Sequence, residues 1–194
     1  MAKMSALRRF ALVTIISVSG LLSSGVGYFA YLKATGNFHV VEAGRVYRSA
    51  QMSESELNRM IAQYGIRSVL NLRGAYPGEA WYDNEVAVSR ANGIDHFDYA
   101  LRPDKLVNVK QSEELLQAIR NAPSPLLIHC KMGSDRTGLV SALYLFSRTK
   151  NRGFAGHELS LRYGHFPYLT SRSNAMDESF QAYVTYALNR EGKQ

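Results

Sequence analysis

Short apolar runs alternate with amphipathic stretches along most of the chain, and this alternation predicts the fold. Four runs have the length of buried strands: Val46–Arg48, Arg67–Leu72, Ile94–Ala100 and Pro125–His129. Stretches with helical spacing lie between and after them, at 53–65, 79–92, 111–121, 137–148, 156–163 and 175–189. Strands that alternate with helices indicate an α/β domain. We therefore predict a mostly parallel sheet flanked by helices within residues 38–190.

Capping residues mark where two of these helices begin or end. Ser53 and Glu56 have the spacing of a capping box, in which each side chain binds a backbone N–H group of the other residue. Gly65 and Gly93 follow helical stretches and suit the left-handed conformation that ends many helices. We expect one helix to begin after Ser53 and end at Gly65, and the next to end at Gly93.

The N-terminal segment has a different pattern, because residues 10–32 contain no charged side chain. At about 1.5 Å per residue, a helix of this length would cross a hydrocarbon core of roughly 30 Å. Lys3, Arg8 and Arg9 precede it, so the positive-inside rule places residues 1–9 in the cytoplasm. We expect residues 10–32 to be a single-pass transmembrane anchor, and the domain to lie outside the cytoplasm, in the periplasm if the source is bacterial.

The competing interpretation of this segment is a cleaved signal peptide. Phe10–Leu22 would be its apolar core, and Ser23–Gly27 would supply the small residues near a cleavage site. The apolar stretch continues beyond that point to Leu32, which favours the anchor. Both interpretations export the domain.

Composition narrows the functional classes. The chain has 194 residues, a formal net charge of +7 and a single cysteine, Cys130. One domain plus one extra segment fits this length. A single cysteine excludes an intramolecular disulfide, and the five histidines show no metal-ligand spacing, so we expect no metal and no cofactor. No basic stripe is interleaved with aromatic residues, so we expect no nucleic-acid partner.

The decapeptide from His129 to Gly138 is the strongest candidate for chemistry. Cys130 lies six residues before Arg136, between a predicted buried strand and a predicted helix. Backbone N–H groups at a helix N-terminus are unpaired and attract anions. In such surroundings the pKa of a cysteine falls from about 8.5 into the range of roughly 3.5 to 7.5. The pattern therefore predicts a phosphate-binding loop that carries a thiolate nucleophile.

Each residue of this loop has an expected role. Arg136 offers a planar fork that can hold two phosphate oxygens. His129 is placed to orient the loop, and Thr137 can donate its hydroxyl to the sulfur when the thiolate leaves. The backbone of the intervening residues would cradle the phosphate, and these residues are Lys131, Met132, Gly133, Ser134 and Asp135.

His-Cys-x5-Arg-Thr-Gly resembles the signature of cysteine-dependent protein tyrosine phosphatases, and the compact length is similar to the dual-specificity branch. The stretches 46–51 (Val-Tyr-Arg-Ser-Ala-Gln) and 68–73 (Ser-Val-Leu-Asn-Leu-Arg) and the Gly-Ser-Asp-Arg-Thr-Gly loop look like bacterial dual-specificity-type phosphatases. The resemblance implies a phosphomonoesterase that works through a phosphocysteine intermediate. It also implies a general acid, an aspartate on a mobile loop upstream of the cysteine.

Two aspartates compete for the role of general acid. Asp104 follows a predicted strand, and ligands gather beyond the carboxyl ends of parallel strands. Asp135 lies within the phosphate loop, directly before the arginine, as in myotubularin-like relatives. Asp104 is the first choice, although an ordinary turn residue would fit its position equally well. Arg73 also follows a strand, so it is a possible substrate contact.

The sequence leaves the substrate open. The short domain lacks the extra loop that clamps phosphotyrosine in larger relatives, so a shallow pocket could take a phosphorylated protein or a phospholipid or phosphoinositide headgroup. Two other classes remain: a phosphate-binding docking module without catalysis, and a redox sensor with an exposed thiolate. Both would bind or become oxidised without turnover.

Overall fold

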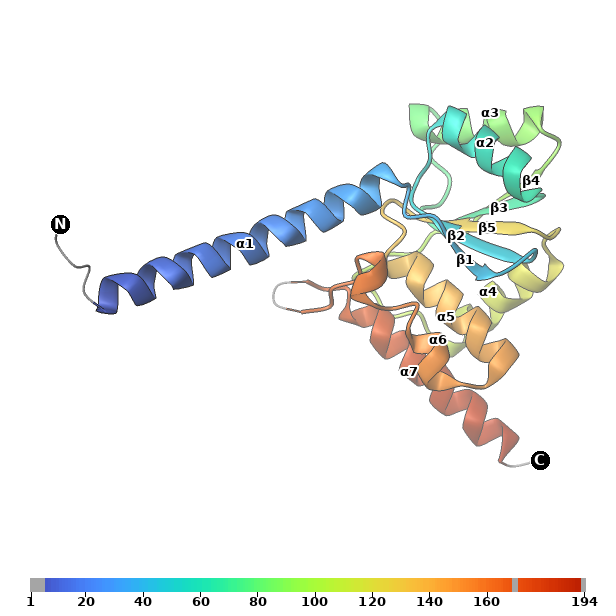
Figure 1. The fold of residues 1–194 in the computed structure, drawn as a ribbon. Helices are drawn as coiled ribbons and strands as arrows, with labels where there is room; N and C mark the ends of the chain where they lie inside the picture. The colour runs from blue at the N-terminus through green and yellow to red at the C-terminus, as the bar shows by residue number, and fades with distance from the viewer. Residues whose placement is uncertain (1–5, 169–170, 193–194) are drawn as a thin grey trace. The chain divides into compact units, whose positions relative to one another are not determined.

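The computed structural model describes residues 6–168 and 171–192. It divides into two compact units, Met1–Thr35 and Gly36–Gln194. The described part of the first unit is helix α1 (Ala6–Ala34), which covers the helix expected at residues 10–32 (Figure 1). No helix in the described part of the chain has the combination of length and apolar content that crossing a membrane requires. The membrane-spanning role expected for residues 10–32 is therefore unsupported.

The described part of the second unit contains one five-stranded sheet with the order β1-β2-β5-β3-β4. Strand β1 (His39–Glu42) pairs antiparallel with β2 (Val46–Ser49). The other pairs are parallel and join β2, β5 (Leu126–His129), β3 (Ser68–Asn71) and β4 (Asp95–Asp98). The prediction of a mostly parallel α/β sheet is confirmed.

Helices cover both faces of this sheet (Figure 1). One face carries α2 (Glu54–Tyr64) and α3 (Ala80–Ala91), and the other carries α4 (Val109–Asn121), α5 (Asp135–Thr149) and α7 (Asn174–Glu191). Alternate strand residues point to opposite faces. Leu127 therefore packs in the cluster under α2 and α3, whereas Leu126 and Ile128 pack in the larger cluster with α4, α5 and α7.

Two elements differ from the sequence prediction. Strand β1 was missed, because its sequence, His-Val-Val-Glu, has only two adjacent apolar residues between polar ones and shows neither an apolar run nor an alternation. The helix predicted at 156–163 is wrong. A five-residue helix, α6 (Arg152–Gly156), ends where that stretch begins, and only a 3-10 turn, η1 (Leu161–Tyr163), follows before Gly164 turns the chain with φ +79°.

Candidate active site

The candidate site lies at the carboxyl ends of three neighbouring parallel strands. β5 lies between β2 and β3, and its last residue, His129, is in register with Ser49 of β2 and Asn71 of β3. Cys130 follows directly. Leu72 N donates to the carbonyl of His129 at 2.9 Å, so the chain after β3 also runs beside the cysteine. The sheet therefore brings three separate segments of the sequence to one edge.

The first half of the loop is held by donors outside it. Gln51 N donates to the carbonyl of Lys131 at 3.3 Å, and Asn37 Nδ2 donates to the carbonyl of Met132 at 2.9 Å. The side chains of Lys131 and Met132 are exposed. Because a trans peptide points its N–H group away from its carbonyl, these contacts turn the next N–H groups toward the opposite side of the loop.

Arg48 holds the second half of the loop through hydrogen bonds to its backbone. This fully buried side chain donates from Nη2 to the carbonyls of Gly133 at 2.6 Å and Ser134 at 3.5 Å. Its Nη1 contacts Glu158 Oε2 at 2.5 Å, and its Cζ lies 3.9 Å from the ring centroid of Tyr163. A buried charge needs such a partner. Arg48 is thus a positioning residue. In the sequence it stands out only as a member of the stretch 46–51 that carries the family resemblance.

The carbonyls of residues 131–134 are consequently all hydrogen-bonded away from the loop centre. The N–H groups of residues 132–135 point the other way, and α5 adds the positive end of its dipole at Asp135. Convergent N–H groups of this kind bind anions. The phosphate-binding role predicted for residues 131–135 fits this arrangement and stays a prediction.

Gly133 is required by the geometry of the loop. Its φ is +71°, in the left-handed region, and it approaches the end of β2 closely. A Cβ at this position would lie 2.7 Å from Ala50 N and from the carbonyl group of Ser49. Both the backbone conformation and the close approach exclude a larger residue.

The expected nucleophile and its arginine lie on either side of this cradle. Cys130 is a free, buried thiol with 2% exposure. Arg136 Nη1 contacts the carbonyls of Leu101 at 3.3 Å and Leu72 at 3.4 Å. Its guanidinium therefore lies beside the two segments that follow β3 and β4. Thr137 Oγ1 is buried, and it has no hydrogen-bond partner within the described residues. Its hydroxyl is therefore available to a neighbouring sulfur.

His129 is oriented by Glu85 of α3. The His129 Nε2 and Glu85 Oε1 atoms lie 3.0 Å apart, and the same carboxylate accepts from His96 at 2.8 Å and from Gln51 at 2.5 Å. Burial alone would raise the pKa of Glu85. The charge and hydrogen bond of His129, with the other two hydrogen bonds, instead hold this pKa far below its usual range. Glu85 was missed, because a lone acid within a helical stretch carries no distinguishing sequence signal.

The two candidate acids lie in different settings. Asp104 forms a side-on pair with Arg102, with Nε–Oδ1 and Nη2–Oδ2 distances of 3.1 and 3.0 Å, and this hydrogen bonding lowers the pKa of Asp104. Asp135 binds the buried His165 at 2.7 Å. Both carboxylates therefore have cationic partners, and within the described residues no hydrogen bond or ion pair joins Asp104 to the phosphate loop.

Arg73 lies beside the loop. Its Nη1 donates to Gln51 Oε1 at 3.2 Å, and its Cζ lies 3.3 Å from the ring centroid of Trp81. Burial and the nearby charge of Arg136 lower the pKa of Arg73, and Cys130 acts weakly in the opposite direction. The structure thus brings Arg73, Arg136 and Cys130 together.

The described residues contain no group of three or more His, Cys, Asp or Glu side chains that could hold a metal ion. The loop itself supplies a thiol, an arginine and backbone N–H groups.

A sequence model described as the tyrosine phosphatase family matches residues 29–147. The chain belongs to this family. The match covers the cysteine loop and the strands that position it, so it agrees with the geometry above. Tyrosine phosphatases of this superfamily are cysteine-based enzymes, which places the chain in an enzyme class. No curated protein matches the chain.

Solved structures show the same fold. The catalytic core of the PP-IP phosphatase SIW14 from S. cerevisiae has a TM-score of 0.60 and 18% identity, covering 80% of this chain and 93% of its own. TpbA from P. aeruginosa has a TM-score of 0.59 and 19% identity, covering 79% and 92%. PTPMT1 in complex with PI(5)P has a TM-score of 0.58 and 14% identity, covering 77% and 98%. The similarity to these three structures concerns the fold.

Proposed function

We propose that this chain is a phosphomonoesterase that works through a phosphocysteine intermediate. The observation that carries the proposal is the loop of residues 131–134, whose four carbonyls are all bonded away from its centre while Cys130 and Arg136 lie at its two ends. Such a loop presents N–H groups and one guanidinium to the oxygens of a phosphate.

The reaction would have two steps. In the first, Cys130 Sγ attacks phosphorus, the bond from phosphorus to the ester oxygen breaks, and a general acid protonates the departing alkoxide. In the second, water attacks phosphorus and gives a proton to the carboxylate that acted as the acid, the bond from phosphorus to sulfur breaks, and the sulfur leaves as a thiolate. The unpartnered Thr137 hydroxyl would stabilise that leaving thiolate by hydrogen bonding. Glu85 would hold His129, and with it the base of the loop, in place.

We propose Asp104 as the general acid. Asp135 is bound to the buried His165 at 2.7 Å, and the pKa of that histidine is raised to about 9, so Asp135 is already engaged by a cationic partner. Among the described residues Asp104 is paired only with the exposed Arg102, and such surface pairs are weak. The carbonyl of Leu101, three residues earlier, contacts the Arg136 guanidinium at 3.3 Å. Asp104 would therefore reach the leaving group when it separates from Arg102.

The first test is hydrolysis of an aryl phosphate by the purified chain under reducing conditions, with Cys130→Ser as the control and vanadate as the inhibitor. Turnover that disappears in Cys130→Ser and is blocked by vanadate would support the phosphatase. A folded protein that binds phosphate without turnover would instead favour the docking module. Oxidation of Cys130 by peroxide without any turnover would favour the redox sensor.

The substrate class remains a proposal of its own. Among the neighbours, TpbA was solved with pTyr and PTPMT1 with PI(5)P. We propose a dual-specificity type of site that accepts phosphorylated proteins, with a phospholipid or phosphoinositide headgroup as the alternative. Comparison of kcat/KM for phosphotyrosine and phosphothreonine peptides with that for phosphoinositide vesicles distinguishes the two.

We also propose that the domain is exported. The support is the uncharged sequence from Phe10 to Leu32, which follows Lys3, Arg8 and Arg9. Fractionation of cells that express the full chain, with mass analysis of its N-terminus, tests this proposal. A shortened chain outside the cytoplasm would indicate a cleaved signal peptide, a full-length chain in the membrane fraction would indicate an anchor, and a full-length cytoplasmic chain would contradict export.

A further inference from the structure

Arg73 lies in a turn whose backbone is held in one conformation by hydrogen bonds and close packing. Asn71 accepts a hydrogen bond from Arg73 N at 2.9 Å through Oδ1, and its Nδ2 donates to the carbonyl of Gly74 at 2.9 Å and to Asp98 at 2.7 Å. Gly74 has φ +87°, and a Cβ there would lie 2.7 Å from Ala100 Cβ. The backbone beneath Arg73 is therefore fixed on both sides.

The side chain of Arg73 is fixed as well. Trp81 covers one face of the guanidinium, with Cζ 3.3 Å from the ring centroid, and Gln51 Oε1 accepts from Nη1 at 3.2 Å. Gln51 in turn donates to the buried Glu85 at 2.5 Å. These contacts orient the guanidinium, but they use only its Nη1 donor. Within the described residues, no hydrogen bond uses Nε or Nη2 of Arg73.

The edge of a guanidinium formed by Nε and Nη2 is the one that binds anions side-on, and in Arg73 this edge is unused. The Arg102–Asp104 pair shows the arrangement in this same molecule, with Nε and Nη2 donating to two oxygens of one carboxylate at 3.1 and 3.0 Å. Arg73 has no carboxylate oxygen within salt-bridge distance among the described residues. An oriented, partly buried arginine with a free bidentate edge suits a phosphate group.

Arg73 begins next to Arg136, the arginine that is expected to hold the reacting phosphate. Arg136 contacts the carbonyl of Leu72 at 3.4 Å, and that carbonyl belongs to the peptide that joins Leu72 to Arg73. Arg136 therefore contacts the peptide group at which Arg73 begins, and its charge is near enough to lower the pKa of Arg73. The phosphate in the loop already has Arg136 and the N–H groups of residues 132–135 as donors, so Arg73 offers donors beyond those that one phosphate needs.

We propose that Arg73 forms a second phosphate subsite, and that preferred substrates carry another phosphate next to the one that is removed. This inference rests on the proposed phosphatase function. It narrows the substrate to small molecules or headgroups with neighbouring phosphates, such as inositol bisphosphates free in solution or attached to lipid.

The test separates binding from turnover by using Cys130→Ser, in which no phosphocysteine can form. In this background, the Kd of an inositol bisphosphate with neighbouring phosphates is compared with that of an inositol monophosphate. We expect the bisphosphate to bind about ten- to a hundredfold more tightly, the usual effect of a charged hydrogen-bonding pair. Adding Arg73→Gln should remove most of this preference, and Arg73→Lys should restore only part of it, because lysine lacks the fork.

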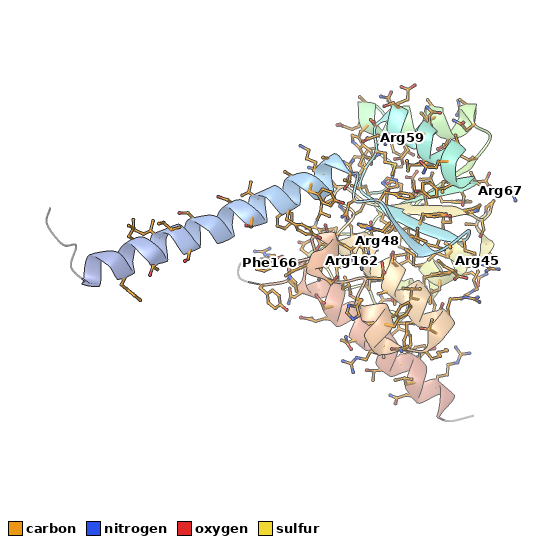
Figure 2. All side chains as sticks on the ribbon, in the orientation of Figure 1. Arg45, Arg48, Arg59, Arg67, Arg162 and Phe166 are labelled. Carbon is orange, nitrogen blue, oxygen red and sulfur yellow. The ribbon has the colours of Figure 1, made fainter. Side chains whose placement is uncertain are left out.

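Arg67→Gln is the matched control. This exposed arginine directly precedes β3 (Figure 2), whereas Arg73 follows the other end of that strand, so the variant removes the same charge without affecting the preference. Equal weakening of both ligands by Arg73→Gln would overturn the proposal, because Arg73 would then serve the reacting phosphate or the loop. Melting temperatures of all variants identify any that fail to fold, and the milder Arg73→Lys then supplies the comparison.

The outcomes for the subsite and for the enzyme are distinct. A preference for the bisphosphate in Cys130→Ser, without hydrolysis of any phosphate by the wild type, would keep the subsite and reject the phosphatase. Hydrolysis by the wild type with no preference for the bisphosphate would do the reverse. Repeating the comparison with the same headgroup in lipid vesicles shows whether the free or the lipid-attached form is preferred.

Discussion

His165 Nδ1 lies 2.7 Å from Asp135 Oδ1, so a buried histidine is bound to the residue directly before Arg136 in the phosphate loop. Its other ring nitrogen lies 2.8 Å from Asp177 Oδ2 of α7. Burial would lower the pKa of His165, but the hydrogen bonds and charges of Asp135 and Asp177 raise it to about 9. A cationic histidine therefore ties the loop to α7 at neutral pH.

The contacts of His165 with Asp135 and Asp177 predict that the free energy of unfolding depends on pH. The pKa of His165 is about 9 in the folded chain and 6.5 in its ordinary state. Its contribution to the free energy of unfolding is thus fully present below pH 6.5 and is lost as pH rises through about 9. We expect wild type to lose up to about 3 kcal/mol relative to His165→Gln across this window. Urea unfolding of both proteins at several pH values measures this difference.

The exposed His157 provides the control for this experiment, because it occupies a surface position. His157→Gln should follow the wild-type pH dependence throughout. A constant stability difference between wild type and His165→Gln from about pH 6 to pH 10 would contradict a cationic His165.

Substitution of the two candidate acids should give different substrate patterns. Asp104→Asn should lower kcat by about 10²-fold or more with an alkyl phosphate, and by less with an activated aryl phosphate whose leaving group needs little protonation. Asp135→Asn should slow both substrates alike, because it acts through the loop and His165. Asp177→Asn, which removes the other carboxylate from His165, is the matched control for that indirect effect.

The Arg102 side chain gives a second measurement on the same assignment. Its hydrogen bonds lower the pKa of Asp104, so Arg102→Gln should allow this carboxyl group to stay protonated at higher pH. The alkaline limb of kcat for an alkyl phosphate should then move to higher pH. An unmoved limb, together with a normal rate in Asp104→Asn, would exclude Asp104 as the acid.

The buried Arg48–Glu158 pair should affect both stability and activity. Arg48→Met leaves the Glu158 carboxylate buried without its partner, which typically costs about 3–5 kcal/mol. Adding Glu158→Gln removes that charge, so the double variant should regain stability without regaining activity, since the carbonyl of Gly133 still lacks its donor. Chemical unfolding and aryl phosphate kinetics measure the two effects. Arg59→Gln, at an exposed site on α2, is the surface control.

Recovery of activity together with stability in the double variant would show that Arg48 matters only for folding. Loss of activity in Arg59→Gln would show that general charge, rather than the contact with the loop, explains the effect.

The contrast between Cys130 and Glu85 shows what the sequence could predict. The candidate reacting residues of the loop are contiguous in sequence, and the strands before it are apolar runs, so local pattern was sufficient to single out the loop and to predict the strands. The capping box of Ser53 and Glu56 was equally local and is confirmed, as is the helix end at Gly65. Local signals of this kind do not depend on how the chain folds back on itself.

The supporting contacts join residues far apart in the sequence. Arg48 meets Glu158 across 110 positions, and Glu85 meets His129 across 44. No periodicity or motif links such pairs, because they become neighbours only when the sheet has formed. The contacts that orient the loop could therefore be identified only from the structure.

Gly133 offers the sharpest test of the loop geometry, because Gly44 is a matched control. Both have a positive φ, +71° and +70°, but a Cβ at Gly133 would lie 2.7 Å from backbone atoms of residues 49 and 50, whereas nothing lies within 4 Å at Gly44. Gly44→Ala should therefore cost only the strain of the left-handed conformation, about 1–2 kcal/mol, with normal kcat/KM. Gly133→Ala carries the same strain and must also displace the loop from β2. We expect it to lower kcat/KM by about 10²-fold or more, as misplacement of a catalytic group by about 1 Å does. Thermal unfolding and aryl phosphate kinetics of the two variants measure both quantities. Equal activity in the two variants would mean that the loop tolerates the shift and that its close approach to β2 does not set the phosphate site.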